Sequence, residues 1–206
     1  MCFYVKPKGD YMKEVLVAED HLGESVSLND YTHIRAYHAC RPISAEEYLE
    51  KGIIPFTHAA ALDSAVTLFQ SSRATYNEVA KVVRQVWTQY GDSSMTRVWL
   101  SLSRAELLGA SCHYLIYGSE FLNAVSMHLG CRDKLKSIGR PTIVVCDIPL
   151  KDIGSTWLDG IEKAIEDETF GNWAIPISRV DSACIVEFQH PTGVVYDPYL
   201  CEEYVL

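Results

Sequence analysis

Two stretches of the chain show the alternation of side chains that is typical of a β-strand. In residues 33–40 one face carries three apolar residues and a histidine: Ile34, Ala36, His38 and Cys40. In residues 97–102 three apolar residues alternate with a tryptophan and a serine: Val98, Leu100 and Leu102 against Trp99 and Ser101. Residues 142–146 form an uninterrupted apolar run, as expected of a buried strand. We therefore predict three strands that are separated by long segments.

Helical spacing fills most of the chain between the first two of these strands. Residues 59–90 are predicted to be helical, because their second half carries an apolar stripe at helical spacing: Val79, Val82, Val83, Val86 and Tyr90. A Ser or Thr followed three positions later by Glu marks a helix start. This capping box occurs at Ser44, Thr75 and Ser103.

The last third of the chain is rich in strand patterns. Residues 155–168 have the pattern of a helix, and three short strands are predicted after it: residues 175–180, 183–188 and 194–199. Strands and helices are thus grouped rather than alternating in βαβ units, which indicates an α+β fold. Because no repeat or linker divides the 206 residues, we expect one domain. Residues 1–31 would be an N-terminal extension, and 33–206 the core with a helical insertion at about 59–91.

One helix carries polar groups on a face of its own. After a break near Gly109 the helical pattern resumes and continues to Gly130. His113, Tyr117 and Glu120 then share one face, because spacings of four and three bring side chains together. An acid in an otherwise apolar helix needs a partner unless it lies in water. We therefore treat this stripe as a candidate site.

Charge and composition restrict the partners of the chain. It has 27 acidic and 18 basic residues, and this net charge of −9 argues against general binding to nucleic acids or anionic membranes. No apolar run approaches the roughly 20 residues of a membrane span. Lys6 interrupts the apolar start of the chain too early for a signal peptide, so we expect a cytoplasmic protein. A small molecule or a protein is the expected partner.

Cysteine and histidine give weaker chemical signals. The seven cysteines are odd in number and include no CxxC pair, and the seven histidines show no ligand spacing. We therefore expect neither a disulfide framework nor a metal site. The sequence also contains no phosphate loop, Rossmann glycine pattern or nucleophile elbow. Cys40 lies two positions from His38, which leaves open a hydrolase with a thiol nucleophile.

Two segments share features with one family of enzymes. Ala36-Tyr37-His38-Ala39-Cys40-Arg41, a short helix and Gly52-Ile53-Ile54 resemble the first strand, helix and glycine turn of ADP-ribosyltransferases of the poly(ADP-ribose) polymerase and tRNA-phosphotransferase type. Residues 98–103 followed by 115–120 are similar to a strand and helix of rifamycin ADP-ribosyltransferases and related NAD-consuming toxins. The resemblance implies split antiparallel sheets, with the helical insertion between the first two motif strands.

The resemblance also implies an activity. The chain would bind NAD as a substrate and transfer ADP-ribose to a protein, or hydrolyse NAD, without a metal. Cleavage of the bond to nicotinamide puts positive charge on the ribose, which a carboxylate stabilises. The implied catalytic residues are His38, Tyr117, Glu120 and Glu187. The implied NAD-binding residues are His38, Ala39, Arg41, Trp99 and Ser101.

Each implied residue has a role in this mechanism. His38 would bond a ribose hydroxyl, and Arg41 or Arg35 would meet the pyrophosphate. Trp99 or Tyr117 would stack on nicotinamide. For these roles to combine, His38 and the stripe of residues 113–120 must face one crevice.

The sequence departs from the family pattern at several positions. Ala39 stands where a glycine often lets the backbone approach nicotinamide, and Trp99 replaces the usual tyrosine. The C-terminal acid can be Asp181 or Glu187. These departures favour, as an alternative, a non-catalytic binding module on the same scaffold. The hydrolase that uses Cys40 is a third interpretation.

Overall fold

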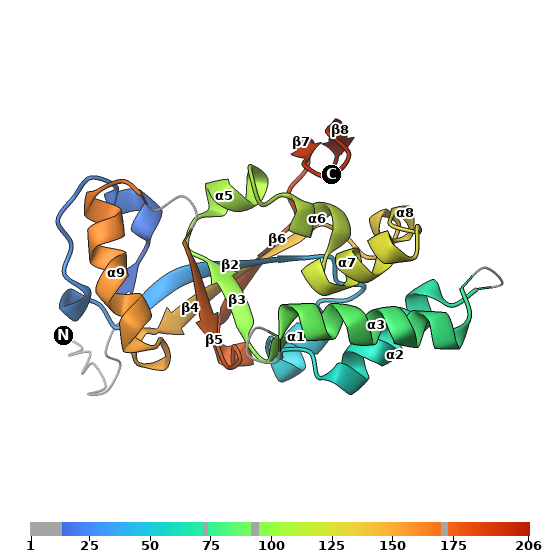
Figure 1. Ribbon diagram of the computed structural model, residues 1–206. Coiled ribbons are helices and arrows are strands. Elements are labelled where there is room, and N and C mark those ends of the chain that lie inside the picture. The colour runs from blue at the N-terminus through green and yellow to red at the C-terminus, as the bar shows by residue number, and fades with distance from the viewer. Residues whose placement is uncertain (1–13, 72–73, 92–94, 170–172) are drawn as a thin grey trace, which may run out of the picture.

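A sheet runs through the centre of the structure, between α9 at one end and α2 and α3 at the other (Figure 1). The computed structural model describes residues 14–71, 74–91, 95–169 and 173–206. Within these residues the sheet has six strands in the order β5-β3-β2-β4-β6, with β1 beside β2. The strands are β1 Val15–Leu16, β2 His33–Cys40, β3 Val98–Ser101, β4 Thr142–Pro149, β5 Ala174–Ile177 and β6 Ile185–Gln189.

Helices occupy most of the segments in which the sequence predicts them, although the predicted helix of residues 59–90 is divided in two and the helix of residues 133–136 was not predicted. They are α1 Glu46–Lys51, α2 His58–Phe69, α3 Tyr76–Tyr90, α5 Arg104–Leu108, α6 His113–Tyr117, α7 Glu120–His128, α8 Asp133–Lys136 and α9 Ser155–Glu166. The strands pair antiparallel except for β1 with β2. The structure therefore confirms a mixed α and β class with antiparallel strands. The helical insertion is present between β2 and β3 as α2 and α3.

The central strand β2 is paired very differently on its two sides. Its whole length, from His33 to Cys40, pairs with β4. On the other side it meets β3 at one pair of residues, Tyr37 opposite Ser101. Beyond that pair β3 continues against β5. The sheet therefore opens between β2 and β3 on the Cys40 side of Tyr37.

The two faces of β2 lie against different apolar clusters. Ile34, Ala36 and Cys40 belong to a large cluster that β3, β4, β5 and α9 share. Tyr37 and Ala39 belong to a smaller cluster, which α5 and α6 complete. Because side chains alternate along a strand, α6 packs on the face of β2 opposite to the one that carries His38.

The helical insertion builds a third apolar cluster away from the sheet. Phe69 of α2, Val83 of α3 and Phe121 of α7 are almost fully buried there. Thr75 begins α3 with the predicted capping box, in which Thr75 Oγ1 accepts from the Glu78 backbone and Glu78 accepts from the Thr75 backbone. This insertion is therefore a packed part of the fold rather than a loose excursion.

Two predicted helix boundaries are wrong. The capping box at Ser44 does not form, because α1 begins at Glu46 and Ser44 Oγ accepts from the Glu46 backbone instead. The helix predicted from residue 113 to Gly130 is broken at Gly118, whose φ is +83°. Ser119 then caps a new helix by accepting from the Leu122 backbone. The stripe of His113, Tyr117 and Glu120 therefore spans two helices.

The last predicted strand does not join the central sheet. It forms β7 Val194–Asp197, which pairs with β8 Glu202–Val205 as a separate hairpin beside α6 (Figure 1). The sequence analysis missed β8, in which two glutamates stand at the start of the strand. We call residues 194–205 the C-terminal hairpin.

The predicted N-terminal extension is partly built into the core. Leu16 and Ala18 are buried in the large cluster against the sheet. The remainder of the predicted extension, residues 1–13, lies outside the described residues. No helix in the described part of the chain is long and apolar enough to cross a membrane.

Candidate functional site

His38 lies where the sheet opens between β2 and β3. Its side chain is half-buried, and Nδ1 lies 3.3 Å from the Trp99 carbonyl oxygen. Burial lowers the pKa of His38, and the bond to the Trp99 carbonyl only partly offsets this effect. The imidazole is therefore neutral near pH 7. Because a carbonyl accepts, Nδ1 carries the proton, which leaves Nε2 as a hydrogen-bond acceptor.

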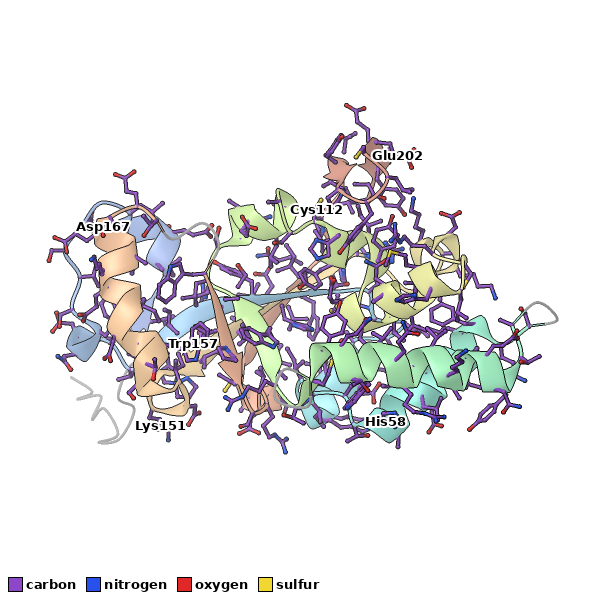
Figure 2. All side chains as sticks on the ribbon, in the orientation of Figure 1. His58, Cys112, Lys151, Trp157, Asp167 and Glu202 are labelled. Atoms are coloured by element: carbon purple, nitrogen blue, oxygen red, sulfur yellow. The ribbon has the colours of Figure 1, made fainter. Side chains whose placement is uncertain are left out.

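The indole of Trp99 borders a hollow that residues of β3, β5 and α9 line together with Trp173. The hollow has a volume of about 290 Å³ and is lined by Trp99, Trp157, Trp173 and Ala174. Trp99 is 42% exposed, and its ring stands edge-on to Trp157 with centroids 6.0 Å apart. Trp157 projects from α9 toward β3 and β5 (Figure 2). Three indoles around one hollow favour a flat, apolar ring as the ligand group.

A glycine on α9 makes room for one wall of this aromatic hollow. A Cβ at Gly160 would lie 2.3 Å from the Trp173 ring. The ring therefore packs directly on the helix backbone at Gly160. At about 290 Å³ the hollow is at the small end of ligand pockets and fits one ring system rather than a whole dinucleotide.

Glu120 is the centre of a second group of polar side chains. Its carboxylate accepts from the hydroxyl of Tyr90 at 3.1 Å and from that of Tyr199 at 3.3 Å, and His113 Nε2 lies 3.1 Å away. The bond from His113 lowers the pKa of Glu120, and the two tyrosines add to this effect against the opposing influence of burial. Glu120 is therefore ionised and well supplied with donors.

Asp197 forms the other half of this group. It is fully buried and accepts from the Tyr117 hydroxyl and from the backbone of Tyr199 at 3.0 Å. Lys136 Nζ lies 3.6 Å from its carboxylate. Burial by itself would raise the pKa of Asp197, but these bonds outweigh it and lower the pKa. We call the group around Glu120 and Asp197 the tyrosine–acid cluster.

Tyr199 links the two acids and was not singled out by the sequence analysis. Its ring stands edge-on to His113 at 5.5 Å and to Tyr117 at 5.9 Å. The Arg132 guanidinium lies over the same ring at 4.7 Å. Tyr199 lies in the turn between β7 and β8, whereas the sequence pattern predicted a strand through residue 199. The cluster therefore fastens the C-terminal hairpin to α6 and α7.

The structure brings His113 and Glu120 of the predicted stripe into contact and places Tyr117 beside Tyr199, but it does not bring these residues to His38. His113 and Tyr117 belong to α6, which packs on the Tyr37 and Ala39 face of β2. His38 points to the opposite face, because it alternates with those two residues. The single crevice predicted for these groups is therefore wrong.

Two further predicted residues, Arg41 and Ser101, are engaged in local contacts. The Arg41 guanidinium donates to the carbonyl oxygens of Ile138 at 2.9 Å, Leu115 at 2.9 Å and Lys136 at 2.7 Å, so its donors hold these segments together. We therefore remove Arg41 from the candidate ligands of a pyrophosphate. Ser101 Oγ donates to the Ser103 carbonyl within the same turn.

The remaining predicted residues lie apart from the aromatic hollow. Ala39 is buried against α5 and α6. Glu187 is exposed on the edge strand β6 and accepts from Gln189. It lies opposite Val145, which belongs to the same cluster as Ala39, so it also faces away from His38. The alternative acid Asp181 is exposed and pairs with Arg179 at 3.1 Å. The predicted acids are thus distributed over three places.

Arg35 and Cys40 also have partners that bear on the predictions. Arg35 Nε donates to Asp147 at 2.9 Å, in an ion pair across β2 and β4. Cys40 is buried beside Tyr48, and burial raises the pKa of its thiol to about 12. A thiol with such a pKa stays protonated at neutral pH, which argues against a nucleophilic role for Cys40.

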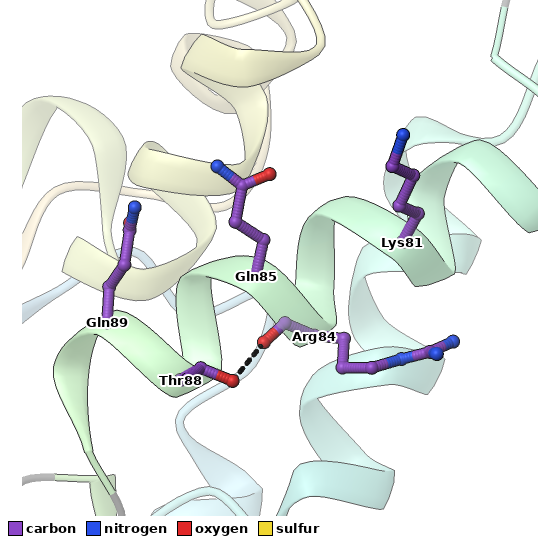
Figure 3. Close-up of a pocket in the computed structure, with 5 residues that line it drawn as sticks. All are labelled: Lys81, Arg84, Gln85, Thr88 and Gln89. Atoms are coloured by element: carbon purple, nitrogen blue, oxygen red, sulfur yellow. Dashed lines mark hydrogen bonds between the residues drawn. The ribbon is translucent and has the colours of Figure 1, made fainter.

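A second hollow lies on the outer surface of α3. It has a volume of about 430 Å³, and the residues around it all come from that helix: Lys81, Arg84, Gln85, Thr88 and Gln89 (Figure 3). The Thr88 hydroxyl donates to the Arg84 carbonyl within the helix. Because one helix surface supplies the whole lining, we do not treat it as a ligand site. Within the described residues, no group of three or more His, Cys, Asp or Glu side chains is placed to hold a metal ion.

Comparison of the chain with protein-family models, with curated proteins and with solved structures finds no match. The functional interpretation therefore rests on the residues and geometry described above.

The lowered pKa of Glu120 predicts how stability depends on pH. A carboxyl whose folded pKa is depressed stabilises the fold above its ordinary value of 4.5, and this contribution is lost as pH falls through the folded pKa. Unfolding by urea at a series of pH values below 5 should show a shallower decline for Glu120→Gln than for the unchanged chain. Glu50→Gln, at an exposed position on α1, serves as the control and should leave the slope unchanged. An equal slope for all three proteins would contradict the prediction.

Proposed function

We propose that the chain binds NAD where the sheet opens between β2 and β3, as an ADP-ribosyltransferase-like protein. ADP-ribose transfer to a protein, or hydrolysis of NAD, is the reaction that this proposal implies. The observation that carries it is the link through Trp99. The Trp99 carbonyl engages His38, and its indole lines the aromatic hollow.

The chemistry of these groups suits a nucleotide. A planar nicotinamide or adenine ring can stack on an exposed indole. A neutral imidazole with Nε2 as acceptor can receive a hydrogen bond from a ribose hydroxyl. The hollow holds one ring system. Trp99 shares a face of β3 with Ser101, which lies opposite Tyr37, so the rest of NAD would have to pass through the opening of the sheet to reach His38 on the other face.

The arrangement of the elements is compatible with the same family. β2 is followed by α1 and then by Gly52, whose φ is +73°. An antiparallel sheet that opens beside its central strand also corresponds to the split sheets that the resemblance implies. These features support an ADP-ribosyltransferase-like fold, whereas His38 and the aromatic hollow support NAD as the ligand.

Binding of NAD can be measured by thermal unfolding and calorimetry. A ligand at a hundred times its dissociation constant adds about 2.7 kcal/mol to the free energy of unfolding. We expect NAD to stabilise the unchanged chain, and Trp99→Ala to weaken binding by about tenfold or more, since stacking on an indole contributes about 1–3 kcal/mol. His38→Ala should also weaken binding, by the loss of about one hydrogen bond.

A matched control separates this site from general effects. Tyr76→Ala removes a half-exposed aromatic ring from the start of α3, and it should leave NAD binding unchanged. Absence of any stabilisation by NAD at millimolar concentration would exclude the proposal. Equal binding by Trp99→Ala and the unchanged chain would exclude this location.

A second candidate is a non-catalytic NAD-binding module on the same scaffold. It is favoured by the position of the acids, because Glu120 and Glu187 do not lie on the face of β2 that carries His38. Release of free nicotinamide from NAD distinguishes the two. Binding with release supports the enzyme, and binding without release supports the module.

A further inference from the structure

The aromatic hollow keeps a large apolar surface in contact with solvent. Trp99 is 42% exposed, and Trp157 and Trp173 beside it are only partly buried. Exposed apolar surface in a concave site is typical of a place that another group covers. A segment of the same chain starts close enough to reach it.

The first described residue lies near the start of α9, the helix that carries Trp157. The Glu14 carbonyl accepts from the backbone of Thr32 at 2.9 Å, and the Thr32 carbonyl accepts from the backbone of Leu150 at 3.1 Å. Leu150 precedes α9 by a few residues, and Trp157 lies in the first turn of that helix (Figure 2). Residues 1–13, which lie outside the described residues, therefore join the fold beside one wall of the hollow.

The length of this segment is sufficient for it to reach the hollow. An extended chain spans about 3.3 Å per residue, so the roughly ten residues between Tyr4 and Glu14 can span about 33 Å. Two backbone hydrogen bonds in series and a short loop separate Glu14 from the first turn of α9. The apolar end of the segment can therefore lie over the hollow without full extension.

The composition of residues 1–13 suits a hollow that is lined by indoles. They begin with the apolar run Phe3-Tyr4-Val5. Aromatic rings pack favourably against indoles, and the hollow of about 290 Å³ has the size of one ring system. The segment also carries three lysines against one aspartate, in a chain whose net charge is −9. Its positive charge is therefore attracted to the rest of the chain, and an ammonium group is attracted to an indole face.

We propose that residues 1–13 cover the aromatic hollow and place the ring of Phe3 or Tyr4 in it. Because the segment is tethered, its effective concentration at the hollow is in the millimolar range. The consequence for NAD rests on the proposed function, in which a ring of NAD occupies the same hollow. The segment and NAD then compete, and the segment acts as a competitive inhibitor that is part of the chain.

Quenching of tryptophan fluorescence by acrylamide tests the docking without NAD. Three of the four tryptophans of the chain line the hollow, so their access to acrylamide reports whether it is covered. The double variant Phe3→Ala/Tyr4→Ala, made in the whole chain, should be quenched about twofold more strongly than the unchanged chain, because its indoles face solvent. Tyr11→Ala removes another aromatic ring of the same segment and should be quenched like the unchanged chain.

Calorimetry with NAD tests the competition. The double variant should bind NAD at least about threefold more tightly than the unchanged chain, because a larger fraction of its hollows is open. Equal quenching of the two proteins, or an equally large effect of Tyr11→Ala, overturns the docking. Equal affinity for NAD in two proteins that both bind it overturns the competition. If NAD binds to neither protein, the proposed function fails, and the quenching result still decides whether the segment covers the hollow.

Discussion

Gly52→Ala is expected to lower the free energy of unfolding by about 3 kcal/mol or more. A Cβ at this position would lie 1.9 Å from the Val180 carbonyl oxygen, which is backbone and cannot move aside like a flexible side chain. The φ of +73° adds strain for any residue other than glycine. The same carbonyl also accepts from the Ile53 backbone at 2.9 Å, so a shift would break this bridge.

Gly91 provides a matched control for this prediction. It also ends a helix with a φ of +73°, but a Cβ there would meet nothing within 4 Å. Gly91→Ala should therefore cost only the backbone strain, about 1 kcal/mol. Urea unfolding followed by circular dichroism measures both variants. Equal destabilisation of the two would show that the close approach to Val180 is unimportant.

Asp197→Ala should destabilise the chain by about 3 kcal/mol, because it removes a buried charge and leaves its partners unpaired. The Tyr117 hydroxyl and the Tyr199 backbone would each lose their acceptor. Lys136 contacts two acids of the hairpin, Asp197 at 3.6 Å and Glu202 at 3.7 Å, and it would lose the nearer one. The hairpin should then exchange its amide hydrogens faster than the central sheet does.

The exposed acid of the same hairpin serves as the comparison. Glu202→Gln removes only a partly exposed ion pair, which contributes little. Hydrogen exchange and urea unfolding of Asp197→Ala and Glu202→Gln should therefore differ strongly. If Asp197→Ala unfolds like the unchanged chain and its hairpin remains protected, Asp197 does not anchor the hairpin.

The sequence predicts the individual helices and strands of this fold better than it predicts which of them pack against one another. Alternation in residues 33–40 correctly separates Ile34 and Ala36 from Tyr37, since a strand exposes its side chains to two faces. It cannot tell which helix covers which face. Packing decides that α6 covers the face of Tyr37, and this choice separates His38 from Glu120.

The sequence predicts contacts within the candidate site only between residues that are a few positions apart in the chain. His113 and Glu120 meet although Gly118 breaks the helix between them, because the break keeps the two short helices in contact. Tyr199 reaches the same place from about 80 residues further along the chain, in a turn that the sequence pattern predicted as the end of a strand. The three-tryptophan hollow is likewise formed by segments that are distant in sequence.

The dependence of Glu120 on Tyr199 has a consequence for biosynthesis. Synthesis on the ribosome proceeds from the N-terminus, so α6 and α7 emerge long before residues 197–199. During that interval Glu120 lacks the Tyr199 hydroxyl, and Tyr117 lacks the Asp197 carboxylate, because the hairpin supplies both groups. A nascent chain can therefore pair β2 with β4 early, but it finishes this junction only after the hairpin has been translated.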